Sequence, residues 1–490
     1  MIPIFNKKTN QQFSFGKTNS QEIIANFDGG KITSDAGIVL MAELDKKLGI
    51  TAKFTESFLD HRNSSYVDYS VHQLLMQRVY AIALGYEDVN DHDKLRHDPA
   101  LAIALNRVDL LDSTQGALAG KSTINRFEYC PPTILKQSKS RYHRIEHQPE
   151  QIKKVFVDIF LESYEKPPRQ IILDMDVTDD QVHGNQEGAF FNTYYDGVCY
   201  APLYIFCGHH LLVARLRSSN VDPAAGALEE LQRIREKWTQ TQIIVRGDSA
   251  YSREDIMKFC EEQSGVDYVL ALSTNSQLKM RALNTIEKAM ADYNQRLEPV
   301  TSLMETLFSP EEDLKEVNQL VPESIFYRSL YYQTQTSWSQ QRRVVTKVSY
   351  GSSGLQIRHV VTSLPANKIS PSLLYTEKYA PRGEMENRIK EQQLDLFADR
   401  TSTQTFDSNQ LRLWLSSMAY VLMQAFRQKC LSKTSLAKAT VGTIRLCLLK
   451  LGAKITISVR RILIAISSAC PDRDIWAVAY SSIQNLSASG

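Results

Sequence analysis

Apolar positions recur along the chain with two different periods, and the change of period divides it. In the first third, apolar residues return every three or four positions, as on one face of a helix, in SDAGIVLMAELDKKLG (34–49), VHQLLMQRVYAIALG (71–85) and STINRFE (122–128). Glycine after the second stretch is a typical helix end. We therefore expect residues 1–165 to form a helical N-terminal domain.

A strand pattern begins at QIILDMDVTDD (170–180), where compact β-branched runs replace the helical period. The expected strands are 170–177, 199–208, 210–217, 242–249 and 267–273, and the expected helices are 222–238 and 253–263. Three strands, a helix, and then alternating strand and helix is the order of an RNase H-like sheet. The predicted fold class is therefore α/β, with an RNase H-like catalytic domain after the helical one.

Residues after Asn275 lose the strand–helix alternation. Three polar–apolar alternating strands are predicted at 324–335, 342–351 and 356–364, so we expect a β-rich insertion, followed by helices at 377–397 and 410–426. The expected divisions are the N-terminal domain (1–165), the first part of the catalytic domain (166–275), the insertion (276–365), the second part of the catalytic domain with basic helices (366–470) and a C-terminal tail (471–490).

The amino-acid composition argues against a membrane protein and against a disulfide-rich or zinc-knuckle protein. With 43% hydrophobic and 23% charged residues, and no apolar run of membrane-spanning length, the chain is expected to be cytoplasmic and not membrane-bound. The seven cysteines contain no Cys-x-x-Cys pair, which argues against a zinc knuckle and a disulfide framework. Reduced, mostly buried thiols are expected.

The formal net charge of +2 conceals a basic C-terminal segment. Between Thr401 and Cys470 the only acid is Asp407. The ten cations are Arg412, Arg427, Lys429, Lys433, Lys438, Arg445, Lys450, Lys454, Arg460 and Arg461. Such a segment could neutralise DNA phosphates, although solvated helix faces often carry the same charge.

Three aspartates stand where chemistry is expected. Asp174 and Asp176 are two apart on a predicted core strand and so share one face, which is unfavourable unless a cation lies opposite. Asp248 ends the strand IIVRGD, at the edge where open α/β sheets place functional groups. Each aspartate alone could equally cap a turn.

A fourth acid, Glu386, lies in the predicted helix 377–397. Its neighbours Tyr379, Arg382 and Lys390 are spaced three or four apart, so all four would line one stripe. A surface ion pair is the ordinary explanation. Phosphodiester transfer, however, uses about three carboxylates from separate elements to hold two Mg²⁺ ions, and this set meets that requirement.

The joint motifs resemble DDE transposases of bacterial insertion sequences, specifically the group 1 DDE-domain family with a Tyr-x-x-Arg-x-x-x-Glu signature. The resemblance runs from about Asp28 to Arg461. Its motifs are LLMQRVYAIALGYEDVNDHD, LAGKST, DMDVTDDQVHGNQEG, YAPLYIFCGHHLL, RGDS and GEMENRIKEQQLDLFADRTST, besides the signature Tyr379, Arg382 and Glu386.

This resemblance implies a catalytic, metal-binding triad of Asp176, Asp248 and Glu386 that holds two Mg²⁺ ions, for which Mn²⁺ could substitute. The partner would be double-stranded DNA, both terminal inverted repeats and target, bound by a homodimer whose N-terminal domain holds the DNA ends. The resemblance further implies a nucleoid-associated bacterial protein that cleaves the ends and transfers 3'-hydroxyls. The residues expected to contact DNA are Tyr379, Arg382, Lys390 and Arg412.

Several alternatives remain open. Related signatures often continue to a lysine seven residues after the glutamate, where this chain has Gln393, and Lys390 is the candidate to replace it. Alternation does not separate Asp174 from Asp176. A DNA-binding regulator without catalysis and an RNase H-like nuclease without strand transfer are the rival functions. A phosphate-binding loop at GALAGKST is disfavoured because its glycines, Gly116 and Gly120, are one residue too close.

Overall fold

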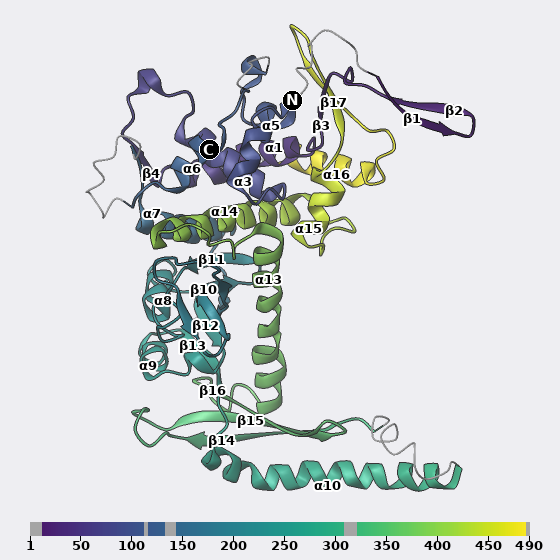
Figure 1. The fold of residues 1–490 in the computed structure, drawn as a ribbon. Coiled ribbons are helices and arrows are strands. Elements are labelled where there is room, and N and C mark those ends of the chain that lie inside the picture. The colour runs from purple at the N-terminus through teal and green to yellow at the C-terminus, as the bar shows by residue number, and fades with distance from the viewer. Residues whose placement is uncertain (1–11, 112–115, 133–143, 308–320, 487–490) are drawn as a thin grey trace. The chain divides into compact units, whose positions relative to one another are not determined.

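The computed structural model describes residues 12–111, 116–132, 144–307 and 321–486 (Figure 1). The chain divides into two compact units. The terminal unit contains Met1–Pro149, Leu394–Ala398 and Trp414–Gly490. The sheet unit contains Glu150–Gln393 and Asp399–Leu413. The domain ranges expected from the sequence, and the functions expected of those domains, stay predictions.

The sheet unit is built on one mixed sheet of eight strands in the order β11-β10-β6-β12-β13-β16-β15-β14. Strands β6, β12 and β13 are parallel to one another, whereas β10 and β11 on one side and β16, β15 and β14 on the other are antiparallel to their neighbours. The strands are β6 Gln170–Val177, β10 Leu203–Cys207, β11 His210–Arg215, β12 Gln242–Gly247, β13 Val266–Leu272, β14 Ser324–Tyr332, β15 Arg342–Gly351 and β16 Gly354–Thr362.

Helices and a small second sheet complete this unit. The helices are α8 Ala227–Arg235, α9 Glu254–Glu262, α10 Ser276–Leu307 and α12 Pro371–Leu373, with most of α7 Pro149–Glu162 and of α13 Glu384–Leu396; Pro149 and residues 394–396 belong to the terminal unit. The small sheet pairs β7 Asp180–Gln181, β9 Gly197–Tyr200 and β8 Phe190–Asn192. The strand expected over 199–208 is thus divided between β9 and β10.

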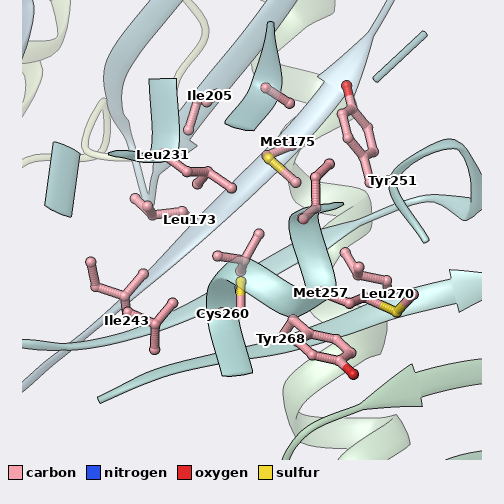
Figure 2. Packing of buried hydrophobic residues seen from close by; sticks show 14 of the residues in the cluster. Leu173, Met175, Ile205, Leu231, Ile243, Tyr251, Met257, Cys260, Tyr268 and Leu270 are labelled. Carbon is pink, nitrogen blue, oxygen red and sulfur yellow. The ribbon is translucent and has the colours of Figure 1, made fainter. Parts of the chain in front are cut away.

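The core of the sheet unit explains why β6 forms where its pattern predicts. Leu173 and Met175 pack with Ile205, and with residues from α8 and α9 such as Leu231 and Met257 (Figure 2). The intervening positions of β6 face the other side, where Ile172 packs near Tyr375. Because successive side chains of a strand point to opposite faces, Asp174 and Asp176 lie on the side of Tyr375.

The inserted segment differs from its expectation in two ways. Its three strands extend the large sheet, since β16 pairs with β13. They are preceded by α10, a 32-residue helix that the sequence analysis missed. Ala282, Ile286 and Ala289 of α10 pack against Val348 of β15.

The terminal unit joins both ends of the chain. Strand β3 pairs with β17, and β17 with β18, so segments more than 400 residues apart share one sheet. The strands are β1 Phe13–Thr18, β2 Gln21–Ala25, β3 Lys31–Thr33, β4 Phe58–Asp60, β5 Ile145–His147, β17 Ala453–Ile457 and β18 Ile462–Ile466. The helices are α1 Ile38–Leu48, α2 Ile50–Thr55, α3 Val71–Ala83, α4 His92–Leu95, α5 Pro99–Ala104, α6 Lys121–Glu128, α15 Val441–Ile444 and α16 Arg473–Gln484. Helix α14, Phe406–Cys430, begins in the sheet unit and ends in the terminal unit.

The composition leads to expectations for the cysteines and for the hydropathy of the helices. All seven cysteines are free, and five of them are buried, as the sequence predicts. Among the described residues, no helix has the length and apolar character needed to cross a membrane.

Candidate active site

The two aspartates of β6 have different partners. Asp174 is buried and accepts two hydrogen bonds from Arg246 of β12, with Nε–Oδ1 at 2.6 Å and Nη2–Oδ2 at 2.7 Å. Arg246 stands beside Asp174 in the parallel register and also donates to the Lys378 carbonyl at 2.7 Å. Asp174 is therefore held in a forked ion pair that links β6, β12 and the segment before α13.

Asp176 and Asp248 stand at the carboxyl ends of neighbouring parallel strands. The register that places Arg246 beside Asp174 brings the two aspartates, each two residues further on, to the same edge of the sheet. The Asp248 side chain accepts a hydrogen bond from the Ala250 backbone N–H at 2.9 Å, which fixes it at the start of a 3-10 turn, Ser249–Tyr251. Sheet topology thus brings together residues that are 72 positions apart.

Arg382 lies between two of the acids. Its Nη1 is 3.2 Å from Asp176 Oδ2, and its Nη2 is 3.6 Å from Glu386 Oε1. The Arg382 side chain is 15% exposed, so this cation is largely withdrawn from water and its attraction to the acids is weakly screened. Arg382 therefore joins the first strand of the parallel set to the start of α13.

The helix expected over 377–397 is not regular. Leu374–Tyr379 forms a π-helical turn and Ala380–Gly383 a 3-10 turn, and only then does α13 begin. Pro381 accounts for the break because proline lacks an N–H and clashes with the preceding turn of an α-helix. The predicted stripe of Tyr379, Arg382, Glu386 and Lys390 is accordingly wrong as a continuous α-helical face.

A cleft of about 740 Å³ in the sheet unit is lined by most of the residues that the sequence predicts for the site. Its walls include Asp176, Asp248, Arg382, Glu386, Lys390 and Gln393. Asp174, Tyr379 and Arg412 are not among the residues that line it. Arg412 instead donates to Ser402 Oγ at 2.6 Å.

Gln393, at the position where related signatures have lysine, binds the turn after Asp176. Its side-chain amide donates to the Asp179 carbonyl at 3.1 Å and to Asp180 Oδ1 at 3.2 Å. Burial raises the pKa of Asp180 well above its usual range. A neutral amide suits this buried contact, whereas Lys390 is exposed at the cleft.

Other residues of the cleft were not anticipated. Asn192 ends β8, Tyr194 and Tyr195 lie in the turn between β8 and β9, and Arg253 precedes α9. Two adjacent tyrosines followed by Asp-Gly indicate a turn with aromatic side chains, but the sequence gives no sign that this turn meets Asp176.

The carboxylates influence one another. Burial raises the pKa of Asp176 to about 6, Arg382 opposes this rise, and the negative charges of Asp248 and Glu386 add to it. A carboxyl group in such surroundings is poorly compensated when ionised, and a further cation would stabilise its charged form.

The sequence is similar to one known protein family along nearly its whole length. A family model described as "Transposase DDE domain group 1" matches residues 15–488. The chain belongs to this transposase family. No curated protein matches the sequence significantly.

Among solved structures, the transposase is similar to the "Cryo-EM structure of piggyBac transposase synaptic complex with hairpin DNA (SNHP)". The identity is 8% and the TM-score 0.39, over 92% of this chain and 81% of that one. This likeness is too distant to carry an argument about fold or function.

The donor set of the transposase suits a hard divalent cation, since three carboxylates from separate elements line one cleft and Asp176 lacks full compensation. Within residues 12–111, 116–132, 144–307 and 321–486, however, no three histidine, cysteine, aspartate or glutamate residues are close enough to hold an ion together. Arg382 supplies the positive charge between Asp176 and Glu386 instead. The chemistry of the donors fits Mg²⁺, whereas a preformed cage is absent from these ranges.

Part of the basic C-terminal segment of the transposase makes internal contacts. Arg427 is buried, Arg445 donates to the Ala83 carbonyl at 2.8 Å, and Lys450 pairs with Asp35 at 2.8 Å. The charge bias of this segment therefore overstates the number of cations available to phosphates.

Stability of the metal-free transposase should depend on the Asp176 charge. In the folded protein Asp176 keeps its proton up to a pKa of about 6, and in the unfolded chain only up to about 3.8, so stability falls as pH rises between these values. We expect Asp176→Asn to raise the free energy of unfolding by about 2–3 kcal/mol at pH 8 in EDTA, because the pKa shift from 3.8 to about 6 already includes the favourable Arg382 ion pair.

Urea denaturation at pH 8 and pH 4 measures this difference. At pH 4 wild-type Asp176 is mostly protonated when folded, so the advantage of asparagine should shrink. A variant less stable than wild type at pH 8, or an equal gain at both pH values, would contradict the assigned electrostatics.

Proposed function

We propose that this transposase binds terminal inverted repeats of an insertion sequence, cleaves the DNA ends and transfers 3'-hydroxyls into target DNA. The observation that carries the proposal is the convergence of Asp176, Asp248 and Glu386 on one cleft, from two parallel strands and a late helix. Five neighbouring strands of the large sheet have the order β11-β10-β6-β12-β13. The pairs β11–β10 and β10–β6 are antiparallel, and the pairs β6–β12 and β12–β13 are parallel, which supports an RNase H-like catalytic domain.

Asp176, Asp248 and Glu386 would hold two Mg²⁺ ions, with Mn²⁺ as a substitute. When bound, such ions activate the attacking oxygen and stabilise the leaving oxygen of a phosphodiester. Asp248 is already oriented by the Ala250 N–H. Arg382 neutralises Asp176 and Glu386 before loading, and its planar donors then suit a phosphate oxygen.

Asp176 is favoured over Asp174 as the first acid because Asp176 lines the cleft. Asp174 is committed to Arg246, whose second contact, with the Lys378 carbonyl, anchors the segment that presents Arg382. Arg246 is thus assigned a positioning role, and Lys390 and Arg382 are assigned contacts with DNA phosphates. The roles of Tyr379 and Arg412 in DNA binding remain predictions.

A homodimer on DNA is part of the proposal, because two ends must be joined to one target. The helical segment before residue 165 would bind the DNA ends. Analytical ultracentrifugation of the DNA complex tests the stoichiometry, for which we expect two chains per pair of ends.

Incubation with labelled DNA of the element's ends, target plasmid and Mg²⁺ tests the proposed function. We expect cleaved ends and end–target joined products on a denaturing gel. Cleavage without joined products in Mg²⁺ or Mn²⁺ would favour the nuclease, and end binding without any cleavage would favour the regulator. Either result would overturn the proposal.

Lys390 offers a test of phosphate contact. Lys390→Ala should weaken DNA binding about equally for all sequences and reduce the slope of log affinity against log salt by about one, because one phosphate contact is lost. Fluorescence anisotropy over a salt series measures this slope. Lys258→Ala is the control, since Lys258 is an exposed lysine of α9 outside the cleft lining; equal slopes for the two variants would contradict the contact.

A further inference from the structure

An exposed aromatic ring stands at the wall of the catalytic cleft. Tyr194 lines the same cleft as Asp176 and Asp248, yet it is 86% exposed. Its ring meets Tyr195 edge-on, with centroids 4.9 Å apart and planes at 86°, so the faces of the Tyr194 ring are not stacked on that neighbour. A π-face is therefore presented beside the acids.

The turn that carries Tyr194 is firmly held. Asn192 Oδ1 accepts hydrogen bonds from the backbone N–H groups of Tyr194 at 2.9 Å and Tyr195 at 3.4 Å, and Asn192 Nδ2 donates to the Ser219 carbonyl at 2.8 Å. The hydroxyl of Ser219 in turn donates to the Phe190 carbonyl at 2.7 Å. These bonds fix the backbone on both sides of the exposed ring.

The same turn is tied to the first catalytic strand. The Tyr195 hydroxyl donates to the Val177 carbonyl at 3.5 Å, next to Asp176. Burial raises the pKa of Tyr195 above its usual range, so this hydroxyl keeps its proton and remains a donor. The position of the Tyr194 backbone is thereby coupled to the strand that carries the first acid.

We propose that Tyr194 stacks on an unpaired DNA base next to the phosphate bound at the acids. This inference rests on the proposed DNA-cleaving function. A base exposes an apolar π-face once it leaves the duplex, and an exposed aromatic ring held in place stacks on any base without reading its sequence. Lys390 lines the same cleft, as does Arg253, which pairs with Asp222 at 2.9 Å, and these cations would attract the phosphates next to that base.

A binding experiment isolates this contact from catalysis. The probes are a forked DNA whose unpaired arms carry thymines and the same fork with abasic arms, which has equal charge but no base to stack. In EDTA, wild type should bind the thymine fork about tenfold more tightly than the abasic fork. Tyr194→Phe should keep this preference, because phenylalanine retains the ring, and Tyr194→Ala should lose most of it.

Tyr331 supplies the matched control. It is 59% exposed on β14 and is not among the residues that line the cleft, so Tyr331→Ala should bind both forks as wild type does. Circular dichroism and duplex affinity of Tyr194→Ala, both expected to match wild type, exclude a folding defect. A wild-type preference that survives in Tyr194→Ala, or is absent from wild type, would overturn the stacking role while leaving the cleavage assay of the proposed function unaffected.

Discussion

Glu386→Gln is expected to lower metal-dependent DNA cleavage about a thousandfold or more. Glu386 is exposed on the first turn of α13, where its carboxylate lies 3.6 Å from Arg382 and lines the cleft of Asp176 and Asp248. A neutral amide keeps the shape of the side chain but withdraws one of the charges that would hold the metal ions. Losing several kcal/mol of transition-state stabilisation has this effect on the rate.

The control is another exposed helical glutamate that forms an i,i+4 ion pair. Glu262 of α9 is 63% exposed and forms an i,i+4 pair with Lys258 at 3.7 Å, much as Glu386 is 52% exposed and pairs with Arg382. Glu262→Gln should cleave at the wild-type rate. Single-turnover cleavage in Mg²⁺ and Mn²⁺ compares the two variants, and similar rates would mean that Glu386 is only a surface ion-pair residue.

Arg246→Met should lower the free energy of unfolding by about 3–5 kcal/mol, because it leaves the Asp174 carboxylate buried without its partner. The variant also loses the contact with the Lys378 carbonyl, so the segment that carries Arg382 should be less well positioned. Urea denaturation followed by tryptophan fluorescence measures the loss.

Two further variants test whether the instability comes from the unpaired, buried Asp174 carboxylate rather than from the loss of a cation alone. Lys258→Met removes an exposed ion pair and should change stability by less than about 1 kcal/mol. Asp174→Leu combined with Arg246→Met removes both buried charges and should recover much of the lost stability. A double variant as unstable as Arg246→Met alone would show that the buried charge is not the cause.

The parts of the fold that sequence predicts well are those where local pattern and burial agree. Strand β6 occupies 170–177 as expected, because its apolar residues alternate between two packed faces. Helix α10 was missed although Leu278, Ala282, Ile286, Ala289 and Tyr293 repeat at helical spacing. Its alanines and many polar residues weaken the contrast between an apolar and a polar face from which a helix is predicted.

The sequence pointed to acids that line one cleft, but not to the partners of each side chain. Alternation places Asp174 and Asp176 on one face but cannot reveal Arg246, because that contact depends on which strand lies beside β6 and in what register. The spacing of Tyr379, Arg382 and Glu386 suggests a regular helix, yet Pro381 breaks it into π and 3-10 turns. The position of Tyr194 beside Asp176 is likewise set by tertiary contacts.

The central claim is that three acids distant in sequence share divalent metal ions. Anomalous diffraction from crystals of the transposase with DNA and Mn²⁺ tests it most directly. We expect manganese peaks coordinated jointly by Asp176, Asp248 and Glu386, with Arg382 released from Asp176. Manganese bound elsewhere, or by Asp174 in place of Asp176, or by none of the three acids together would contradict the account.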